Sequence, residues 1–301
     1  MIVFAASITS PETYESCAEP GIRLAAEPDS QVFAYQAAGS IFRSYNLILD
    51  RAAALDDLEA LVLVHQDAEI ADPEFCPKLR RALADPEVGV VGCVGAVGVR
   101  NIAWWEGSVT WGSFTHRYQE MGGGDLPALS WEAEGLPSFA HTGEVDTVDG
   151  FVLAVSPWTA RNVRFDESLG QLHGYDFDFC LQVREAGKKI VATDLKVVHH
   201  HSLELLGDPD AWVQSYVRLT EKWEGRAHQI PSFEGDWKLR AYRAEAEAAA
   251  ARTQRIQTQW QANARESALR NEIETMRGST SWRVTEPLRR LGQIARRPRG
   301  G

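Results

Sequence analysis

Residues 61–70 read LVLVHQDAEI, four consecutive apolar residues followed at once by a polar cluster. An apolar run of this kind is typical of a central strand in a parallel sheet that is covered on both faces. Ligands of open α/β sheets bind beyond the carboxyl ends of the strands, so His65, Asp67 and Glu69 stand where a functional site is expected. Taken alone, the cluster could equally be a solvated strand end whose acids face water.

The segments around this strand alternate between strand and helix character. Short apolar runs predict further strands at 1–6, 31–35, 88–94, 145–155 and 189–199. Helical spacing predicts helices at 44–55, 73–83 and 176–186, the last ended by Gly187. Strands that alternate with helices indicate βαβ units. We therefore predict an α/β fold with a mostly parallel, Rossmann-like sheet flanked by helices. Residues 100–145 are rich in tryptophan and glycine, which favours a loop that faces substrate.

The C-terminal quarter of the chain has a different composition. Residues 237–276 contain no glycine or proline and predict a long helix with a thin apolar stripe, as in a coiled-coil or docking helix. From Arg277 onward the chain holds seven arginines and one acidic residue, Glu286. Leu288, Leu291 and Ile294 would form one side of a basic amphipathic helix on an anionic membrane surface, unless this end is simply solvated. We expect three regions: a sheet domain at 1–230, the helix at 231–277 and the tail at 278–301.

The composition excludes several classes of protein. The formal net charge is −11, and the basic tail leaves the rest of the chain still more acidic, which argues against a nucleic-acid partner. The four cysteines are scattered and predict reduced, structural thiols in a reducing compartment. The first residues lack the features of a signal peptide, and no run of 18 apolar residues occurs. We expect a cytoplasmic protein, with peripheral contact at the inner face of the membrane through the tail as an option.

A second polar cluster lies in HGYDFDFCLQ at 173–182. Asp176 could cap the helix that follows, because an aspartate there satisfies free backbone N–H groups. Two acids among three aromatic residues are nevertheless unusual for capping alone. An aspartate held against aromatic rings has a route to a raised pKa and hence to general-base catalysis.

A third cluster, His199-His200-His201, stands at the end of the last predicted strand. On an extended chain His199 and His201 share one face and His200 the other. At least one of them could complete a metal site with Asp67, and solvated histidines without a ligand are the alternative. The sequence contains no GxGxxG after the first strand, no GxxxxGK[ST], no HExxH and no GxSxG, so a dinucleotide dehydrogenase, a kinase and a serine hydrolase have no motif support.

The ordered set of motifs resembles the inverting family 2 glycosyltransferases of the GT-A fold, in particular a bacterial branch with HQD in place of DxD. The similar stretches, spread over about residues 1–225, are SYN at 44–46, LVLVHQDAEI at 61–70, VDGFVLAV at 148–155, FDE at 165–167, HGYDFDFCLQ at 173–182 and VVHHHS at 197–202. Each motif alone is weak, whereas the set in this order is fairly specific.

The resemblance implies a role for particular residues. Asp67 matches the metal-binding acid, with His65 where the first Asp of the motif usually lies, and His199 matches the histidine that completes the metal site, with His200 and His201 as the alternatives. Asp176 matches the catalytic base, and Tyr175 replaces the Glu common before it. The remaining implied donor-binding residues are Ala6 and Ser7, where the nucleotide base docks, and Asp149 and Gly150, where donor sugar and acceptor meet.

The function implied is metal-assisted transfer of a sugar, with inversion, from a nucleotide-diphosphate sugar to a glycan or lipid-linked acceptor in cell-surface polysaccharide synthesis. The cofactor implied is Mn²⁺ or Mg²⁺. The alternative is a catalytically weak or inactive scaffold that binds a nucleotide sugar or glycan and forms homo-oligomers through the C-terminal helix. A metal-dependent nucleotidyltransferase shares the architecture, but would need a Gly- and Lys-rich phosphate loop near the first strand, which this sequence lacks.

Overall fold

The structure is a computed structural model. It describes residues 1–97, 99, 101–104, 109–112, 114–118, 124–125, 143–200, 208–224 and 236–285. Most of the predicted tryptophan-rich loop, the expected boundary at residue 230 and the predicted amphipathic helix around 288–294 lie outside these residues.

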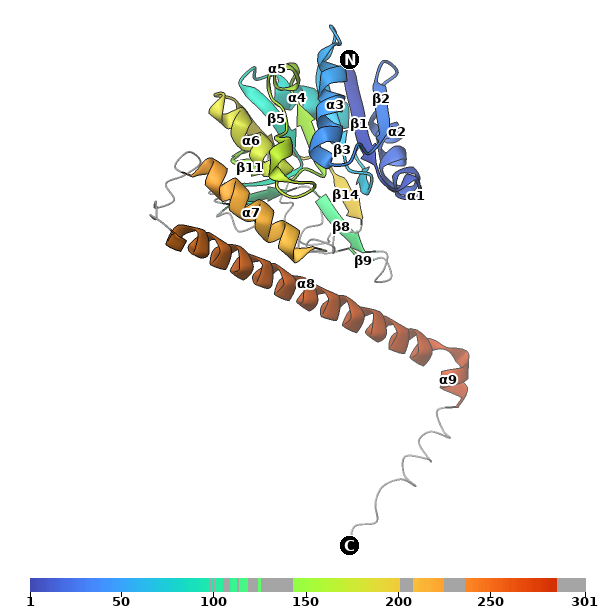
Figure 1. The fold of residues 1–301 in the computed structure, drawn as a ribbon. Coiled ribbons are helices and arrows are strands. Elements are labelled where there is room, and N and C mark those ends of the chain that lie inside the picture. The colour runs from blue at the N-terminus through green and yellow to red at the C-terminus, as the bar shows by residue number, and fades with distance from the viewer. Residues whose placement is uncertain are drawn as a thin grey trace.

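A seven-stranded mixed sheet forms the centre of the fold (Figure 1). Five of its strands run in one direction, and the other two, β10 and β12, are antiparallel to their neighbours. The predicted mostly parallel sheet is therefore confirmed. In spatial order the strands are β10 (Gly143–Val145), β13 (Lys189–Ala192), β5 (Val88–Gly92), β12 (Val152–Val155), β3 (Ala60–Val64), β1 (Ile2–Ile8) and β2 (Gln31–Gln36).

Strand β3, from which the sequence argument began, lies between β12 and β1, and all five of its residues are buried. Its apolar residues are covered by helices, because α3 (Ile41–Ala53) and α5 (Pro157–Asn162) pack on it and on each other. The side chain of Ser40 caps α3 by accepting a hydrogen bond from the backbone N–H of Arg43. Helix α4 (Phe75–Leu83) packs against β5, and α6 (Tyr175–Glu185) packs on β13, β5 and the short strand β11 (Thr147–Val148).

Two smaller sheets continue from the carboxyl ends of the central strands. One has the order β11-β6-β7, with β6 at Val94–Val97 and β7 at Val109–Gly112. The other has the order β4-β14-β8-β9, with strands at Ala68–Ile70, Val197–His200, Phe114–Tyr118 and Gly124–Asp125. The second sheet matters most for function, because β4 follows the HQD segment directly and pairs with the strand that carries the histidines.

Three of the predicted strands are wrong in extent, since each is divided between sheets. The predicted strand 189–199 becomes β13 and β14, separated by residues 193–196, where Lys196 has a positive φ of 42°. The predicted strand 145–155 becomes the end of β10, then β11 and β12. The predicted strand 88–94 continues past a break at Cys93 as β6. In each case the chain leaves the central sheet to build a smaller one.

Helix α6 ends as predicted, because Gly187 follows its last turn with a φ of 79°. The other helical segments before α7 that the structure describes are short: α1 (Pro11–Thr13), the π-helical turn η1 (Tyr14–Ala18), α2 (Glu19–Ala25) and the 3₁₀ turn η5 (Glu167–Leu169).

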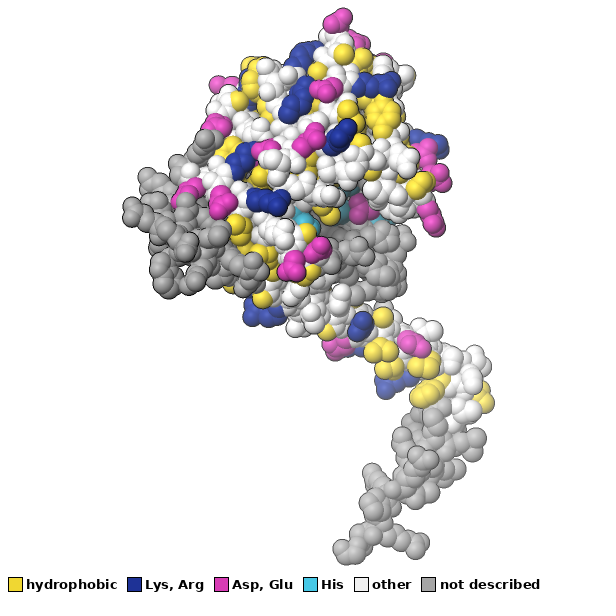
Figure 2. All heavy atoms as spheres, in the orientation of Figure 1, with side chains coloured by type: hydrophobic (Ala, Val, Ile, Leu, Met, Phe, Trp, Pro, Cys, Tyr) yellow, Lys and Arg dark blue, Asp and Glu magenta, His cyan; other side chains and the backbone are white. Residues whose placement is uncertain are grey.

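The C-terminal part consists of α7 (Pro209–Trp223), the long helix α8 (Asp236–Gly278) and α9 (Thr280–Val284). The predicted long helix is thus confirmed. Helix α8 packs against α7 and then extends beyond the sheet domain (Figure 1). Its packed part buries small residues such as Ala249 and Thr253, whereas Leu269, Ile273 and Met276 further along are exposed. Figure 2 shows hydrophobic side chains on this extending part of the helix.

All four cysteines are buried and free, in agreement with their predicted structural role. Within the described ranges, no helix has the length and apolar character needed to cross a membrane.

Candidate active site

The chain turns sharply where β3 ends, and this turn places the HQD residues. The backbone N–H of His65 still donates to the carbonyl of Phe151 on the β12 side, at 2.9 Å, and the N–H of Ala68 donates back to the carbonyl of His65 at 3.0 Å. The side chain of Gln66 accepts from the backbone N–H groups of Thr9 and Ser10. Gln66, to which the sequence argument gave no role, therefore ties this turn to the end of β1.

The pairing of β4 with β14 decides which histidine meets Asp67. His199 lies opposite Ala68 in the antiparallel register, and the N–H of His200 donates to the backbone carbonyl of Asp67 at 2.8 Å. Because side chains alternate along a strand, His199 and His200 point to opposite faces. The ring of His200 contacts Glu69, with Nε2 2.9 Å from Oε2, and the ring of His199 turns to Asp67. His201 lies outside the described residues.

His65, Asp67 and His199 form a cluster in which one possible ligand atom from each residue lies within 4.8 Å of the others. The carboxylate of Asp67 stands between the two rings: Oδ1 is 3.9 Å from Nδ1 of His65, and Oδ2 is 3.5 Å from Nε2 of His199. The ring of His199 also stacks on Phe151, with centroids 4.5 Å apart. Residues that are far apart in sequence are thus brought together as a group able to hold a metal ion.

The pKa values of the two histidines in the cluster shift in opposite directions. Burial lowers the pKa of His65 below its usual value. Burial would also lower the pKa of His199, but the carboxylate of Asp67 outweighs that effect and raises it. Burial alone would raise the pKa of Asp67, and the rings of His199 and His65 instead hold that pKa well below its usual range. The carboxylate of Asp67 thus favours the protonated form of His199, whereas burial favours the neutral form of His65.

Asp176 lies in the first turn of α6, but it is not the residue that caps this helix. The N-cap position is taken by Gly174, which has a φ of 75° and has no room for a side chain against Leu219. The carboxylate of Asp176 accepts hydrogen bonds from the backbone N–H groups of Gly150, at 2.9 Å, and Phe177, at 2.8 Å. Burial, and next to it the charge of Asp149, raises the pKa of Asp176 to about 7.

Asp149 and Gly150 lie beside Asp176. The carboxylate of Asp149 accepts from the indole Nε1–H of Trp104, at 3.1 Å, and from the N–H of Phe151. Trp104 lies at the start of the tryptophan-rich segment, in the part that the structure describes. The composition of this segment favoured a loop that faces substrate, but it did not predict the hydrogen bond of Trp104 to Asp149. Gly150 is needed for space, because a Cβ at this position would collide with the hydroxyl of Tyr175.

Tyr175 joins the Asp176 side of the site to the His65 side. Its hydroxyl lies 2.6 Å from Nε2 of His65. Its ring packs edge-on against Phe42 and Tyr45, in a buried aromatic group. The sequence argument noted Tyr175 only as a departure from the family pattern and missed this contact, because nothing in sequence spacing predicts it.

The two residues expected at the nucleotide base lie near the end of β1. Ala6 is completely buried, and Ser7 is partly exposed. Of the two residues, only Ser7 has exposed surface that could contact a ligand. Both lie on β1, which pairs directly with β3, the strand that leads to His65.

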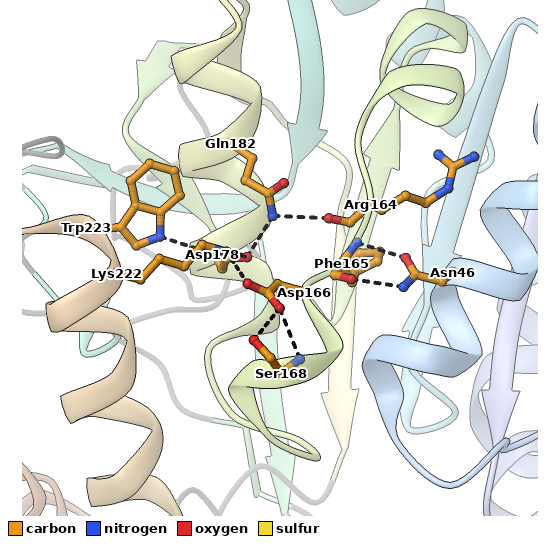
Figure 3. A network of polar contacts seen from close by, with 9 residues as sticks. All are labelled: Asn46, Arg164, Phe165, Asp166, Ser168, Asp178, Gln182, Lys222 and Trp223. Atoms are coloured by element: carbon orange, nitrogen blue, oxygen red, sulfur yellow. Dashed lines mark hydrogen bonds and ion pairs between the residues drawn. The ribbon is translucent and has the colours of Figure 1, made fainter.

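A polar network holds α6, and with it Asp176, in place (Figure 3). Its centre is Asp178, which is completely buried and accepts from Trp223 Nε1 and Gln182 Nε2 at 2.8 and 2.7 Å. The Nζ of Lys222 lies 2.8 Å from Asp178 and 2.7 Å from Asp166. Burial raises the pKa of Asp178, against the opposing effect of Lys222. The network therefore fixes α6 to α7 and to the loop that precedes η5.

A second part of the network reaches α3. The side-chain amide of Asn46 donates to the carbonyl of Phe165 and accepts from its N–H, at 2.9 and 2.8 Å. The carbonyl of Arg164 accepts from Gln182. The motifs SYN at 44–46 and FDE at 165–167 thus meet in this network. They help to hold α6 and are not part of the cluster that could bind metal.

The chain is similar to several known proteins. The profile of a family described as "Glycosyltransferase like family" matches residues 3–215. The Streptomycin biosynthesis protein StrF of Streptomyces griseus is 30% identical over 211 residues, which are 67% of this chain and 67% of that protein. The structure of the mannosyltransferase PcManGT from Pyrobaculum calidifontis, in complex with GDP-Man and Mn²⁺, aligns with 94% of this chain and 81% of its own, at 13% identity and a TM-score of 0.45.

Proposed function

Because the chain belongs to the glycosyltransferase-like family, we propose that it transfers a sugar from a nucleotide-diphosphate sugar to a hydroxyl group of a glycan or lipid-linked acceptor, with inversion at the anomeric carbon. Such an acceptor would place the enzyme in cell-surface polysaccharide synthesis. The observation that carries the proposal is the convergence of Asp67, His199 and His65 into one cluster, with Asp176 linked to it through the contact of the adjacent Tyr175 with His65.

Asp176 is the proposed general base. Its two backbone hydrogen bonds fix the plane of the carboxylate, and a pKa of about 7 is well matched to proton transfer near neutral pH. The carboxylate takes the proton of the acceptor hydroxyl as its oxygen attacks the anomeric carbon. The bond from that carbon to the nucleoside diphosphate breaks, and the diphosphate leaves with the electron pair. One displacement with one base inverts the configuration.

His65, Asp67 and His199 would hold a divalent cation. Adjacent ligands of one ion at bond lengths of about 2.1 Å lie about 3.0 to 3.4 Å apart, and the separations here are 3.5 and 3.9 Å, too long for hydrogen bonds and near that spacing. The residues therefore fit a metal. Mg²⁺ is usually bound through carboxylates, phosphates and water, whereas imidazole is a ligand of transition metals, so Mn²⁺ suits this set better. When bound, the ion supplies charge stabilisation for the departing diphosphate.

The test is loss of turnover without loss of nucleotide binding. A panel of nucleotide-diphosphate sugars is first screened with Mn²⁺ for release of the nucleoside diphosphate, and the active donor is then used with Asp176→Asn. We expect the variant to lose at least about 100-fold in turnover, the usual contribution of a general base, while its thermal shift with the nucleoside diphosphate is kept.

The matched control is Asp50→Asn on α3, whose side chain is 63% exposed and paired with Arg164, and it should keep full turnover. Unchanged turnover in Asp176→Asn would refute the role of this residue. No donor turnover in the wild-type protein, together with nucleotide-sugar binding, would support the non-catalytic scaffold instead.

A further inference from the structure

The contact between Tyr175 and His65 settles which nitrogen of the His65 ring faces the cluster. The hydroxyl of Tyr175 lies 2.6 Å from Nε2, so this nitrogen is occupied on the side away from Asp67. The other nitrogen, Nδ1, is the one 3.9 Å from Oδ1 of Asp67. Only Nδ1 is therefore available to a cation that also touches Asp67.

An imidazole nitrogen binds a metal only through its lone pair, so the proton of a neutral ring must sit on the other nitrogen. Metal-ligating histidines accordingly donate their second N–H to a neighbouring acceptor, which fixes both the tautomer and the orientation of the ring. A tyrosine hydroxyl can accept such a hydrogen bond. At 3.9 Å, an N–H on Nδ1 would have no hydrogen bond to Asp67.

We propose that Tyr175 is a positioning residue of the metal site: its hydroxyl oxygen accepts the Nε2–H of His65 and so presents an unprotonated Nδ1 to a divalent cation shared with Asp67 and His199. This inference rests on the metal site of the proposed function and adds the residue that prepares it. The aromatic group around Tyr175 supports the role, because the buried ring packs edge-on against Phe42 and Tyr45.

The lack of space for a side chain at Gly150 also supports this role of Tyr175. Any Cβ there would occupy the position of the Tyr175 hydroxyl. The loop between β11 and β12, which also donates the Gly150 N–H to Asp176, thus has the shape that the hydrogen bond to His65 requires. One glycine serves both the proposed base and the proposed metal ligand.

The experiment measures Mn²⁺ binding to the full chain by electron paramagnetic resonance, with no sugar donor present. Tyr175→Phe keeps the ring and removes only the hydroxyl, and the matched control is Tyr45→Phe, a buried tyrosine of the same aromatic group. Loss of a partner of a metal-ligating histidine typically costs 10- to 100-fold in affinity. We expect a weakening of about that size for Tyr175→Phe and wild-type binding for Tyr45→Phe.

A second readout uses neither metal nor activity. The ¹⁵N shifts of the His65 ring, assigned by comparison with His65→Gln, report the tautomer in the metal-free wild-type protein. We expect the proton on Nε2, and a mixture of tautomers in Tyr175→Phe. A proton on Nδ1 in the wild type, or equal Mn²⁺ affinity of Tyr175→Phe and the wild type, overturns the inference.

The variant Asp67→Asn distinguishes a wrong role for Tyr175 from a wrong metal site. If the wild type binds Mn²⁺ and Asp67→Asn does not, the site stands, and only the role of Tyr175 is judged by the results above. If Mn²⁺ binding is absent in the wild type, or insensitive to Asp67→Asn, the proposed metal site is wrong and the role of Tyr175 is lost with it.

Discussion

Replacing Asp176 by asparagine should abolish turnover and remove a loss of stability that depends on pH. The asparagine amide has one acceptor oxygen for the two backbone N–H groups that bond the carboxylate, so the pH dependence of the stability difference is the quantity to measure. The pKa of Asp176 is raised from its ordinary value of 3.8 to about 7, first by burial and then by the charge of Asp149. A carboxyl group with a raised pKa in the folded state gives up its proton more easily in the unfolded state. The folded wild type therefore loses stability as the pH rises from about 4 to about 7, and beyond that the loss is constant.

The size of the effect follows from the shift. Each pKa unit corresponds to about 1.4 kcal/mol, which sets an upper limit of about 4 kcal/mol for this group. The side chain of Asp176 is partly exposed, and solvent screening reduces the penalty, so we expect about 1 to 2 kcal/mol. For a chain of this size the melting temperature of Asp176→Asn should rise relative to that of the wild type by about 2 to 8 °C between pH 4 and pH 8.

The assay is thermal denaturation in EDTA at pH values between 4 and 8, with Asp50→Asn as the control for loss of an exposed carboxylate. The stability of Asp176→Asn relative to the wild type should fall toward pH 4, where both proteins are uncharged at this position. In parallel, kcat/KM of the wild type should fall about tenfold from pH 8 to pH 6, because the charged fraction of a group with a pKa near 7 falls from about 0.9 to about 0.1. A melting-temperature difference between Asp176→Asn and the wild type that stays constant from pH 4 to pH 8 would refute the raised pKa.

Two further predictions concern the surroundings of the site. Gly150→Ala forces a Cβ onto the hydroxyl of Tyr175. We expect the free energy of unfolding to fall by about 1 to 3 kcal/mol in denaturation and Mn²⁺ binding to weaken in metal titration. The control is Gly278→Ala, where nothing lies within 4 Å of an added Cβ, and it should behave as the wild type. Asp178→Asn removes a buried carboxylate that accepts from Trp223 and Gln182, and it leaves Lys222 paired with Asp166 alone. We expect a loss of about 1 to 3 kcal/mol in the free energy of unfolding, measured by denaturation, because one amide oxygen replaces two carboxylate oxygens as acceptors; a variant as stable as the wild type would contradict the importance of this network.

The sequence predicted the framework of the site because strand ends in one sheet must lie near one another. The run before His65 identified the central strand, and the alternation of side chains along a strand placed His199 and His200 on different faces. The structure adds the register between β4 and β14, which turns His199 toward Asp67 and leaves Glu69 to His200. Register depends on pairing between distant segments, and no local pattern in the sequence specifies it.

The contacts that sequence did not predict are those made by side chains across the site. Examples are the hydrogen bond from the backbone N–H of Ser10, just after β1, to Gln66, and that from Trp104 to Asp149. The sequence also did not predict that the last strand is divided at residues 193–196, which moves His199 out of the central sheet. The polar residues Thr193, Asp194 and Lys196 stand at this break, and the prediction extended one strand across them.

The contact of Tyr175 with His65 shows what sequence comparison alone leaves out. The resemblance implies a departure at each of these positions, and taken singly each departure suggests the loss of an acid from the site. In the folded chain the two side chains touch, with the tyrosine hydroxyl on the ring nitrogen that does not face Asp67. An imidazole without a partner for its second nitrogen would be a poorly oriented ligand, and a tyrosine without the imidazole would bury an unused hydroxyl at a cost. The two departures therefore make physical sense only together, as one rearranged site.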